Sequence, residues 1–266
     1  MNPLQRTLIE KLGHDNGFEH VLTTEPAATT LASARHRTQV KVSLPSTGGF
    51  YVLLHPASPA LLPELRRTFA SASEDATSFN VDTDASLALL LRRAASLSQA
   101  LPRQTVQHYQ TDVAAELAKL PDSLKGTEVE RLIRQRLGQG RFRAAMLDYW
   151  GGACAVTGVT VPEALRASHA KPWAACESDD ERLDVFNGFL LTANLDALFD
   201  RFLISFDDAG RLMVVPHLTQ ANLQGLGVQT DMKLRWLTDE HRVYLHWHHE
   251  RFLQGRAGRQ GEGVGA

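Results

Sequence analysis

The sequence predicts an α+β protein with an N-terminal mixed α/β domain over residues 1–120 and a C-terminal domain over residues 128–255. Alternating apolar residues over 37–56 predict a β-hairpin, and a helical apolar period over 84–101 predicts a long helix beside it. Short strand-like and helix-like pieces follow one another between residues 154 and 206. A chain of 266 residues can form one large domain or two ordinary ones.

The N-terminal domain is predicted to begin with a helix over residues 3–13, with Pro3 near its start and Gly13 at its end. In the hairpin, apolar and polar residues alternate before and after the turn residues Ser-Thr-Gly-Gly. Residues 21–34 are rich in Thr, Ala and Ser and show only a weak pattern. Further helices are predicted over 58–69, over 84–101 with Asp84 as N-cap and Pro102 beyond its end, and over 111–120.

Residues 121–127, which contain Pro, Ser and Gly, are predicted to link the two domains. Thr127 and Glu130 form a capping-box pattern that opens an arginine-rich helix. Gly138 and Gly140 are expected to break this helix into two pieces. Its arginines allow two interpretations, a charge-rich surface helix or a helix that faces phosphates.

The composition of the chain argues against several classes of function. The net charge of −2 argues against a protein that holds nucleic acid by bulk charge, although arginine outnumbers lysine. We find no apolar run of about 18 residues and no secretory signal, so we expect no membrane association and a cytoplasmic location. Cys154 and Cys176 form no C-x-x-C pair, which argues against a four-ligand zinc site. The glycine-rich tail over 256–266 is expected to be disordered.

Four polar side chains suggest a site for metal-assisted hydrolysis: His169, Asn187, Asp196 and Asp200. The two aspartates lie one helical turn apart, so both project from one helix face and repel each other unless a cation lies between them. A hard divalent cation prefers such oxygen ligands. Each residue alone also has a structural interpretation: a lone histidine is usually structural, Asn-Gly is a hairpin-turn signal, and Asp196 suits a helix start.

The residues around these four side chains resemble the HNH endonucleases. The resemblance covers about residues 140–215, with its core at 150–215, and implies a ββα-metal finger, in which two antiparallel strands and a helix clasp a metal ion. The resemblance rests on five short sequence motifs in the order found in that family: CAVTG at 154–158, SHAKPW at 168–173, NGFLL at 187–191, DALFD at 196–200 and ISF at 204–206.

The resemblance also implies roles for individual residues. His169 matches the general base, and Asn187 matches the asparagine that orients the base loop. Asp196 falls where the final histidine of the motif usually stands as a metal ligand, and Asp200 falls one turn later. Ser168 stands where many relatives place a metal ligand. The expected cofactor is Mg²⁺ or Mn²⁺.

The expected substrate is double-stranded DNA, with backbone contacts from Arg166, Lys171 and Arg201. The resemblance suggests a bacterial restriction or defence nuclease whose N-terminal domain recognises DNA. A homodimer is expected from the need to cut two strands. The alternative is a catalytically weak DNA-binding module that retains the HNH scaffold. The histidines at 246, 248 and 249 are interpreted either as packing residues or as additional metal ligands.

Overall fold

The computed structural model describes residues 1–124 and 126–258. It divides into two compact units, Met1–Gln104 and Thr105–Ala266. The division falls ahead of the predicted linker at 121–127, which joins two helices of the second unit. The predicted α+β class is confirmed, because each unit combines helices with strands that pair only in the antiparallel sense among the described residues.

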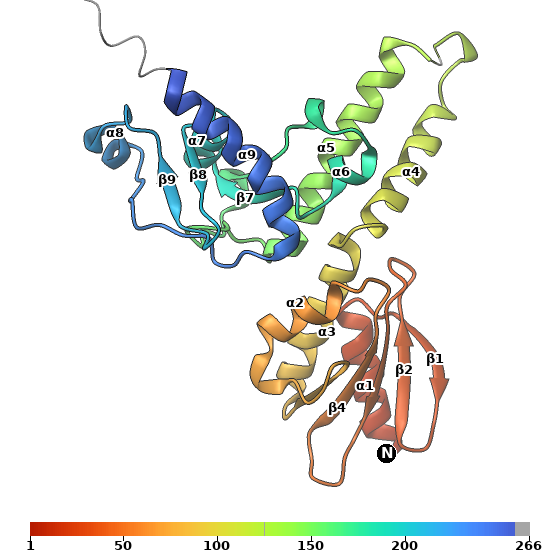
Figure 1. Ribbon diagram of the computed structural model, residues 1–266. Coiled ribbons are helices and arrows are strands. Elements are labelled where there is room, and N and C mark those ends of the chain that lie inside the picture. Colours follow the sequence, from red (N-terminus) through yellow and green to blue (C-terminus); the bar gives the residue numbers. More distant parts are fainter. Residues whose placement is uncertain (125, 259–266) are drawn as a thin grey trace, which may run out of the picture. The chain divides into compact units, whose positions relative to one another are not determined.

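A five-stranded antiparallel sheet forms the centre of the first unit, with its strands in chain order (Figure 1). The predicted hairpin over 37–56 is confirmed, with Val42 opposite Val52. The two strands ahead of it were not predicted from the sequence. The five residues of the edge strand are all exposed, so its sequence carries no apolar alternation. The strands are β1 (His20–Thr24), β2 (Ala28–Ala32), β3 (Gln39–Ser43), β4 (Phe50–His55) and β5 (Ser78–Val81).

Three helices pack with this sheet: α1 (Pro3–Asp15), α2 (Leu61–Thr68) and α3 (Asp84–Ala100). All three were predicted, but two of their end residues were not. The N-cap of α3 is Thr83, whose side chain accepts a hydrogen bond from Ser86 N, rather than Asp84. Helix α1 continues through Gly13 because this glycine is buried against Leu31 and leaves no room for a Cβ.

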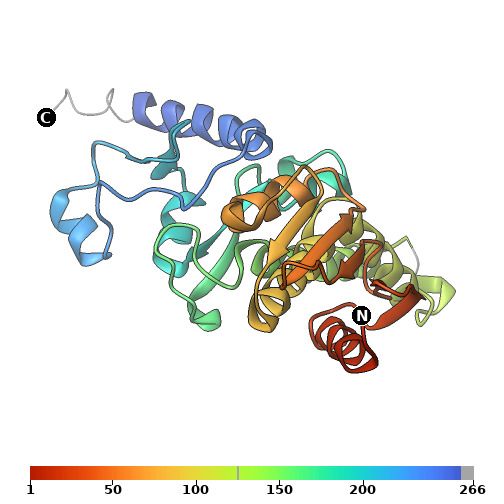
Figure 2. The ribbon, with the colours of Figure 1, turned by 90° about the horizontal axis from the view of Figure 1, so that it is seen from below.

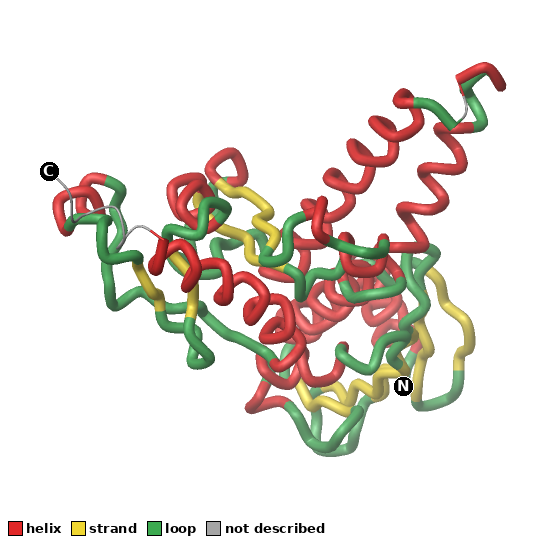
Figure 3. Tube along the Cα trace, turned by 45° about the horizontal axis from the view of Figure 1, so that its top comes forward, coloured by secondary structure: helices red, strands yellow, loops and turns green. Residues whose placement is uncertain are grey.

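The second unit begins with two long helices, α4 (Gln104–Leu117) and α5 (Glu128–Trp150), which run side by side in opposite directions (Figure 3). The predicted break at Gly138 and Gly140 is wrong, because α5 is continuous over 23 residues. Gly138 is needed for packing instead. A Cβ at that position would collide with the indole of Trp173, so the glycine allows the aromatic ring to lie directly against the helix.

The centre of the second unit is a two-stranded antiparallel sheet, β6 (Leu165–His169) and β7 (Gly188–Thr192), followed directly by α7 (Ala193–Phe199). His169 lies opposite Gly188. A Cβ on Gly188 would collide with the backbone carbonyl of Ser168, so this position requires glycine. The arrangement matches the expected order of two strands and one helix.

Smaller elements complete the second unit. Helix α9 packs on β8, and their closeness is visible in Figures 1 and 2. Residues 256–258 of the predicted tail belong to α9, and residues 259–266 lie outside the described residues. Among the helices that the structure describes, none is both long and apolar enough to cross a membrane. The remaining helices and strands are α6 (Asp179–Leu183), β8 (Ile204–Phe206), β9 (Leu212–Val214), α8 (Gln220–Gly225) and α9 (Asp239–Gly258).

Candidate functional site

His169 ends strand β6 and is fixed by two contacts. Its ring stacks on Phe142 of α5, with 3.7 Å between ring centroids. Its Nε2 lies 2.9 Å from the carbonyl oxygen of Arg182. A carbonyl oxygen can only accept a hydrogen bond, so Nε2 carries the proton and Nδ1 keeps its lone pair. Burial lowers the pKa of His169 to about 4, so the imidazole is neutral at pH 7.

Asn187 is fully buried and ties together the loop that joins β6 to β7. Its Oδ1 accepts a hydrogen bond from Lys171 N at 2.8 Å. Its Nδ2 donates to the carbonyl oxygens of Lys171, at 3.1 Å, and Glu181, at 3.0 Å. The interpretation of Asn187-Gly188 as a simple hairpin turn is therefore wrong, because the connection between the strands contains helix α6. The hydrogen bonds of this one amide side chain hold the long connection between the two strands in place.

Helix α7 supplies the acidic pair. The Ser168 hydroxyl donates a hydrogen bond to Asp196 Oδ1 across from β6. Partial burial and the negative charge of Asp196 raise the pKa of Asp200 to about 6, while Arg201 acts in the opposite direction. Two carboxyl groups one turn apart therefore share a region where full ionisation is unfavourable without a nearby cation.

A pocket of about 240 Å³ is lined by some of the site residues predicted from the sequence. His169 and Asp200 both line it, whereas Asn187, Asp196 and Ser168 do not. Ser168 and Asn187 are buried and act behind the pocket wall. The complete lining is Ala167, His169, Pro172, Trp173, Asp200, Phe202 and His248.

The donor set at α7 suits a hard divalent cation. Within residues 1–124 and 126–258, no three or more His, Cys, Asp or Glu side chains converge as a metal site. Mg²⁺ does not require such a group, because one or two carboxylates often hold it while water and substrate phosphates complete its shell. Asp196 and Asp200, with the hydroxyl of Ser168 beside them, fit this ligand class. They do not fit a four-ligand structural zinc.

The three side chains predicted to contact phosphates differ in the hydrogen bonds and ion pairs that they already form within the protein. The guanidinium of Arg166 donates to the carbonyl oxygens of Glu163 and Leu165, each at 2.8 Å. The ammonium of Lys171 lies 2.8 Å from a carboxylate oxygen of Glu181, and this side chain is only 13% exposed. Arg201 is exposed and donates to the carbonyl oxygen of Ala197.

The arginines of α5 lie in ion pairs or donate to backbone oxygens, which favours the interpretation of α5 as a charge-rich structural helix. Arg143 donates to the carbonyl oxygens of Leu165 and Pro162 and so anchors α5 beside β6. The partners of Arg131 and Arg134 lie one turn away on α5, whereas those of Arg136, Arg141 and Arg143 lie on other elements, so the sequence could not show them. The ion pairs are Arg131 with Glu128, Arg134 with Glu130, Arg136 with Glu116, and Arg141 with Asp112.

His248 of α9 supports the packing interpretation, whereas His246 is exposed. His248 is buried, its Nε2 lies 2.9 Å from Phe199 O, and its Nδ1 lies 3.0 Å from Ser205 Oγ. Both ring nitrogens are therefore used within the protein, and the ring stacks on Phe199. His246 is 77% exposed and lies 3.5 Å from Glu250.

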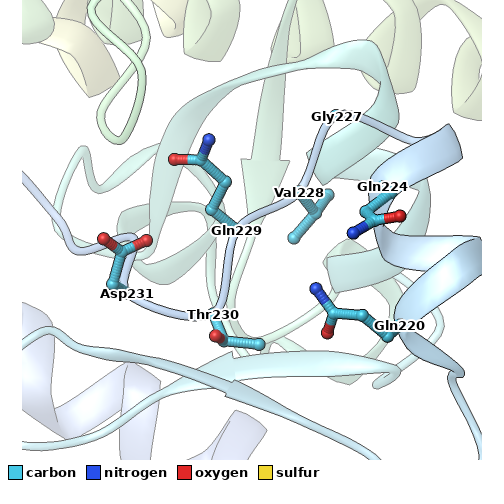
Figure 4. A pocket seen from close by; sticks show the side chains of 7 residues that line it. All are labelled: Gln220, Gln224, Gly227, Val228, Gln229, Thr230 and Asp231. Atoms are coloured by element: carbon cyan, nitrogen blue, oxygen red, sulfur yellow. The ribbon is translucent and has the colours of Figure 1, made fainter.

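A second pocket, of about 480 Å³, lies beside α8 and contains no residue that the sequence singled out. Figure 4 shows the amide groups of Gln220 and Gln224 directed from α8 toward Val228. Its lining is polar with one carboxyl group and carries neither a histidine nor a cationic side chain. It therefore offers hydrogen bonds but no imidazole.

Comparison with known proteins agrees with the position of the first pocket. No curated protein matches the chain. A family model described as HNH endonuclease matches residues 154–207. The matched segment runs from Cys154 through β6, β7 and α7 to the strand β8. It contains His169, Asn187, Asp196 and Asp200, so the similarity to the HNH endonuclease family covers the four side chains singled out from the sequence.

Proposed function

We propose that this protein is a metal-dependent DNA endonuclease and that His169 is its general base. The observation that carries the proposal is the single tautomer of His169, whose Nε2 proton is held by Arg182 O while Nδ1 remains able to accept a proton. The same imidazole lines a pocket with Asp200. A neutral imidazole beside a carboxyl group is the pairing that phosphodiester hydrolysis with an oxygen-bound cation needs.

The reaction is a hydrolysis in which one bond forms and one breaks. A water molecule attacks phosphorus, and its proton passes to Nδ1 of His169. The bond from phosphorus to the 3′ oxygen breaks, and that oxygen takes a proton from solvent. The products carry a 5′-phosphate and a 3′-hydroxyl.

Asp196 and Asp200 would hold the cation, Mg²⁺ or Mn²⁺. When bound, such an ion offsets charge that develops on the phosphate and on the leaving oxygen. Ser168 orients Asp196 through its hydrogen bond rather than lining the pocket. Asn187 acts at a distance, because it holds the loop that presents Arg182 O to His169.

Arg166 and Arg201 are the proposed contacts to the DNA backbone, since both are exposed. Lys171 would have to leave Glu181 to reach a phosphate, so its stronger role is to brace the loop. The first unit is the proposed DNA-recognition part of a bacterial restriction or defence enzyme in the cytoplasm. A homodimer stays a prediction based on the need to cut two strands.

A second candidate function is a DNA-binding module with weak catalysis. The hydrogen bond from Ser168 favours it, because this bond occupies an oxygen of Asp196 that a metal ion would otherwise use. Retention of both the base tautomer and the acidic pair favours the enzyme.

Plasmid cleavage at low salt distinguishes the two functions. Purified protein is incubated with Mg²⁺, Mn²⁺ or EDTA, beside the variants His169→Ala and His246→Ala. The enzyme hypothesis expects metal-dependent nicking or linearisation that is lost in His169→Ala and kept in His246→Ala, whose imidazole is exposed and does not line the pocket. DNA binding without cleavage under every condition would favour the scaffold function. Parallel plasmids with methylated cytosine test whether the first unit recognises modification.

A further inference from the structure

Phe202 adopts a backbone conformation that bulky residues avoid. Its φ is +55°, and Arg103 is the other non-glycine residue with positive φ in the described part of the chain. The amide of Leu203 bonds to Leu198 O, and the amide of Phe202 bonds to Phe199 O, both at 2.9 Å. These two bonds form the Schellman pattern that ends a helix, and Phe202 stands where glycine is usual. Local structure alone therefore favours glycine at this position.

The ring of Phe202 is not used as a core anchor. Phe199 and Phe206, on either side in the sequence, are fully buried, whereas Phe202 is only partly buried. One side of its ring contacts α9, with 4.8 Å between its centroid and that of His248. The ring also lines the pocket that contains His169. The strained backbone thus presents an aromatic surface to the candidate catalytic pocket.

The pocket suits a flat aromatic ligand. Trp173 is a second aromatic side chain in its lining, and no lysine or arginine lines it. A phosphate could share a cation with Asp200 at one edge of the lining, but the other lining residues offer it no positively charged side chain. The volume of about 240 Å³ is below the roughly 300–1,000 Å³ of pockets for drug-sized ligands, which limits the ligand to a small ring. In a DNA substrate, that ring is a nucleobase.

We propose that Phe202, together with Trp173, stacks on a nucleobase next to the scissile phosphodiester. The inference rests on the proposed function for its DNA substrate. A base inside a duplex is stacked on both faces, so it cannot enter the pocket without leaving the helix. The substrate class that follows is DNA with an unpaired base at the cleavage site, such as a single strand, a bulge or a frayed end. Aromatic platforms of this kind bind bases with little sequence preference.

Replacing Phe202 with glycine separates this role from simple packing. Phe202→Gly relieves the backbone strain and removes the ring, so the melting temperature should stay the same or rise. Affinity for a single-stranded oligonucleotide should fall about tenfold or more, the usual effect of losing an aromatic base platform. Phe202→Tyr keeps the ring and should bind like the parent protein. Leu253→Ala removes an exposed apolar side chain of α9 that does not line the pocket and should leave binding unchanged.

Binding is measured by fluorescence anisotropy in EDTA, where no cleavage occurs, with a single strand, a perfect duplex and a duplex with one bulged base. An abasic nucleotide at the bulge should reduce parent binding to the level of Phe202→Gly. Equal binding of parent and Phe202→Gly to all three DNAs would overturn the proposal. If Phe202→Gly has a lower melting temperature than the parent, Phe202→Leu replaces it as the test variant. Leucine keeps an apolar contact with α9 but has no aromatic face, so binding equal to that of the parent would again overturn the proposal. Binding that depends on the unpaired base, without cleavage in the plasmid assay, would overturn only the proposed endonuclease function. Cleavage together with equal binding by the parent and Phe202→Gly would overturn only the proposed stacking.

Discussion

At the scale of single residues, burial and hydrogen bonding determine what His169 can do. Its hydrogen bond to Arg182 O and its stacking on Phe142 fix both the tautomer and the ring orientation. The same burial makes it a weak base with a pKa of about 4. If His169 is the general base, as we propose, it is in its reactive protonation state at neutral pH and depends on a well-placed water molecule rather than on high basicity.

Asn187→Asp should strongly destabilise the protein. The amide nitrogen of Asn187 donates to Lys171 O and Glu181 O, and a carboxylate cannot donate to either. The free energy of unfolding should fall by about 3 kcal/mol or more, because a buried charge would then face two carbonyl oxygens. Urea denaturation measures this loss. Asn222→Asp on the exposed surface of α8 is the matched control and should change stability little. A midpoint equal to that of the control would show that Asn187 does not hold the loop.

Asp184 should make stability depend on pH in the acidic range. Burial raises its pKa to about 6, although Phe186 N and the Tyr244 hydroxyl donate hydrogen bonds to its carboxylate. The folded state therefore binds the proton more tightly than the unfolded state. The contribution of Asp184 to the free energy of unfolding should therefore fall by at most ~3 kcal/mol as pH rises from about 4 to about 6, whereas the lowered pKa values of the buried His169 and His248 act in the opposite direction over this range.

The measurement for Asp184 is urea denaturation at several pH values between 4 and 8. The stability of the parent relative to Asp184→Asn should fall between pH 4 and 6, and Asp208→Asn, at an exposed position, should follow the pH profile of the parent. An identical pH profile for Asp184→Asn and the parent would show that the carboxyl group ionises equally easily in both states.

At the scale of elements, helix α5 forms the support on which the site is built. It contributes Phe142 beneath His169, and Gly138 accommodates the ring of Trp173. Its arginines are held by acids of α4 and α5 rather than being free for DNA. The helix therefore acts as scaffold for the pocket wall, and the exposed cations Arg166 and Arg201 come from β6 and from the turn after α7.

Gly138→Ala and Gly140→Ala should change stability in opposite directions. Alanine favours a helix interior over glycine by about 1 kcal/mol, and Gly140 has open space around it, so Gly140→Ala should stabilise by about that amount. At Gly138 the new methyl group would collide with Trp173, so Gly138→Ala should destabilise by about 1–3 kcal/mol. Thermal unfolding of the two variants measures both effects. Stabilisation by both substitutions would show that Trp173 can move away without cost.

The sequence predicted the site elements better than their contacts. Strand β6, helix α7 and strand β8 could be predicted because each lies in a short sequence motif whose residues determine its local structure. The breaks at the α5 glycines were predicted wrongly, because helix propensity is local and the packing of Trp173 is not. Strand β1 has no buried residues to produce a periodic pattern. The roles of Arg182 O and Phe202 depend on backbone geometry, which no motif in the sequence records.

At the scale of the whole molecule, the chain consists of two units with separate cores. The first contains the five-stranded sheet, and the second contains every residue proposed for catalysis. The match to the HNH endonuclease family lies wholly within the second. Chemistry and selection of DNA are therefore expected to reside in different parts of the chain, since a finger of this size offers few side chains for reading a sequence.

A fragment of residues 105–266 should retain metal-dependent cleavage while losing any preference for particular DNA. The fragment keeps α5 beneath His169 and both acids of α7, so the reacting groups keep their supports. Cleavage of plasmids with and without methylated cytosine, by fragment and full chain at equal concentration, measures both properties. Circular dichroism first establishes that the fragment is folded. A folded fragment with the same preference as the full chain would place DNA selection in the second unit. A folded fragment with no cleavage would show that the first unit contributes to catalysis itself.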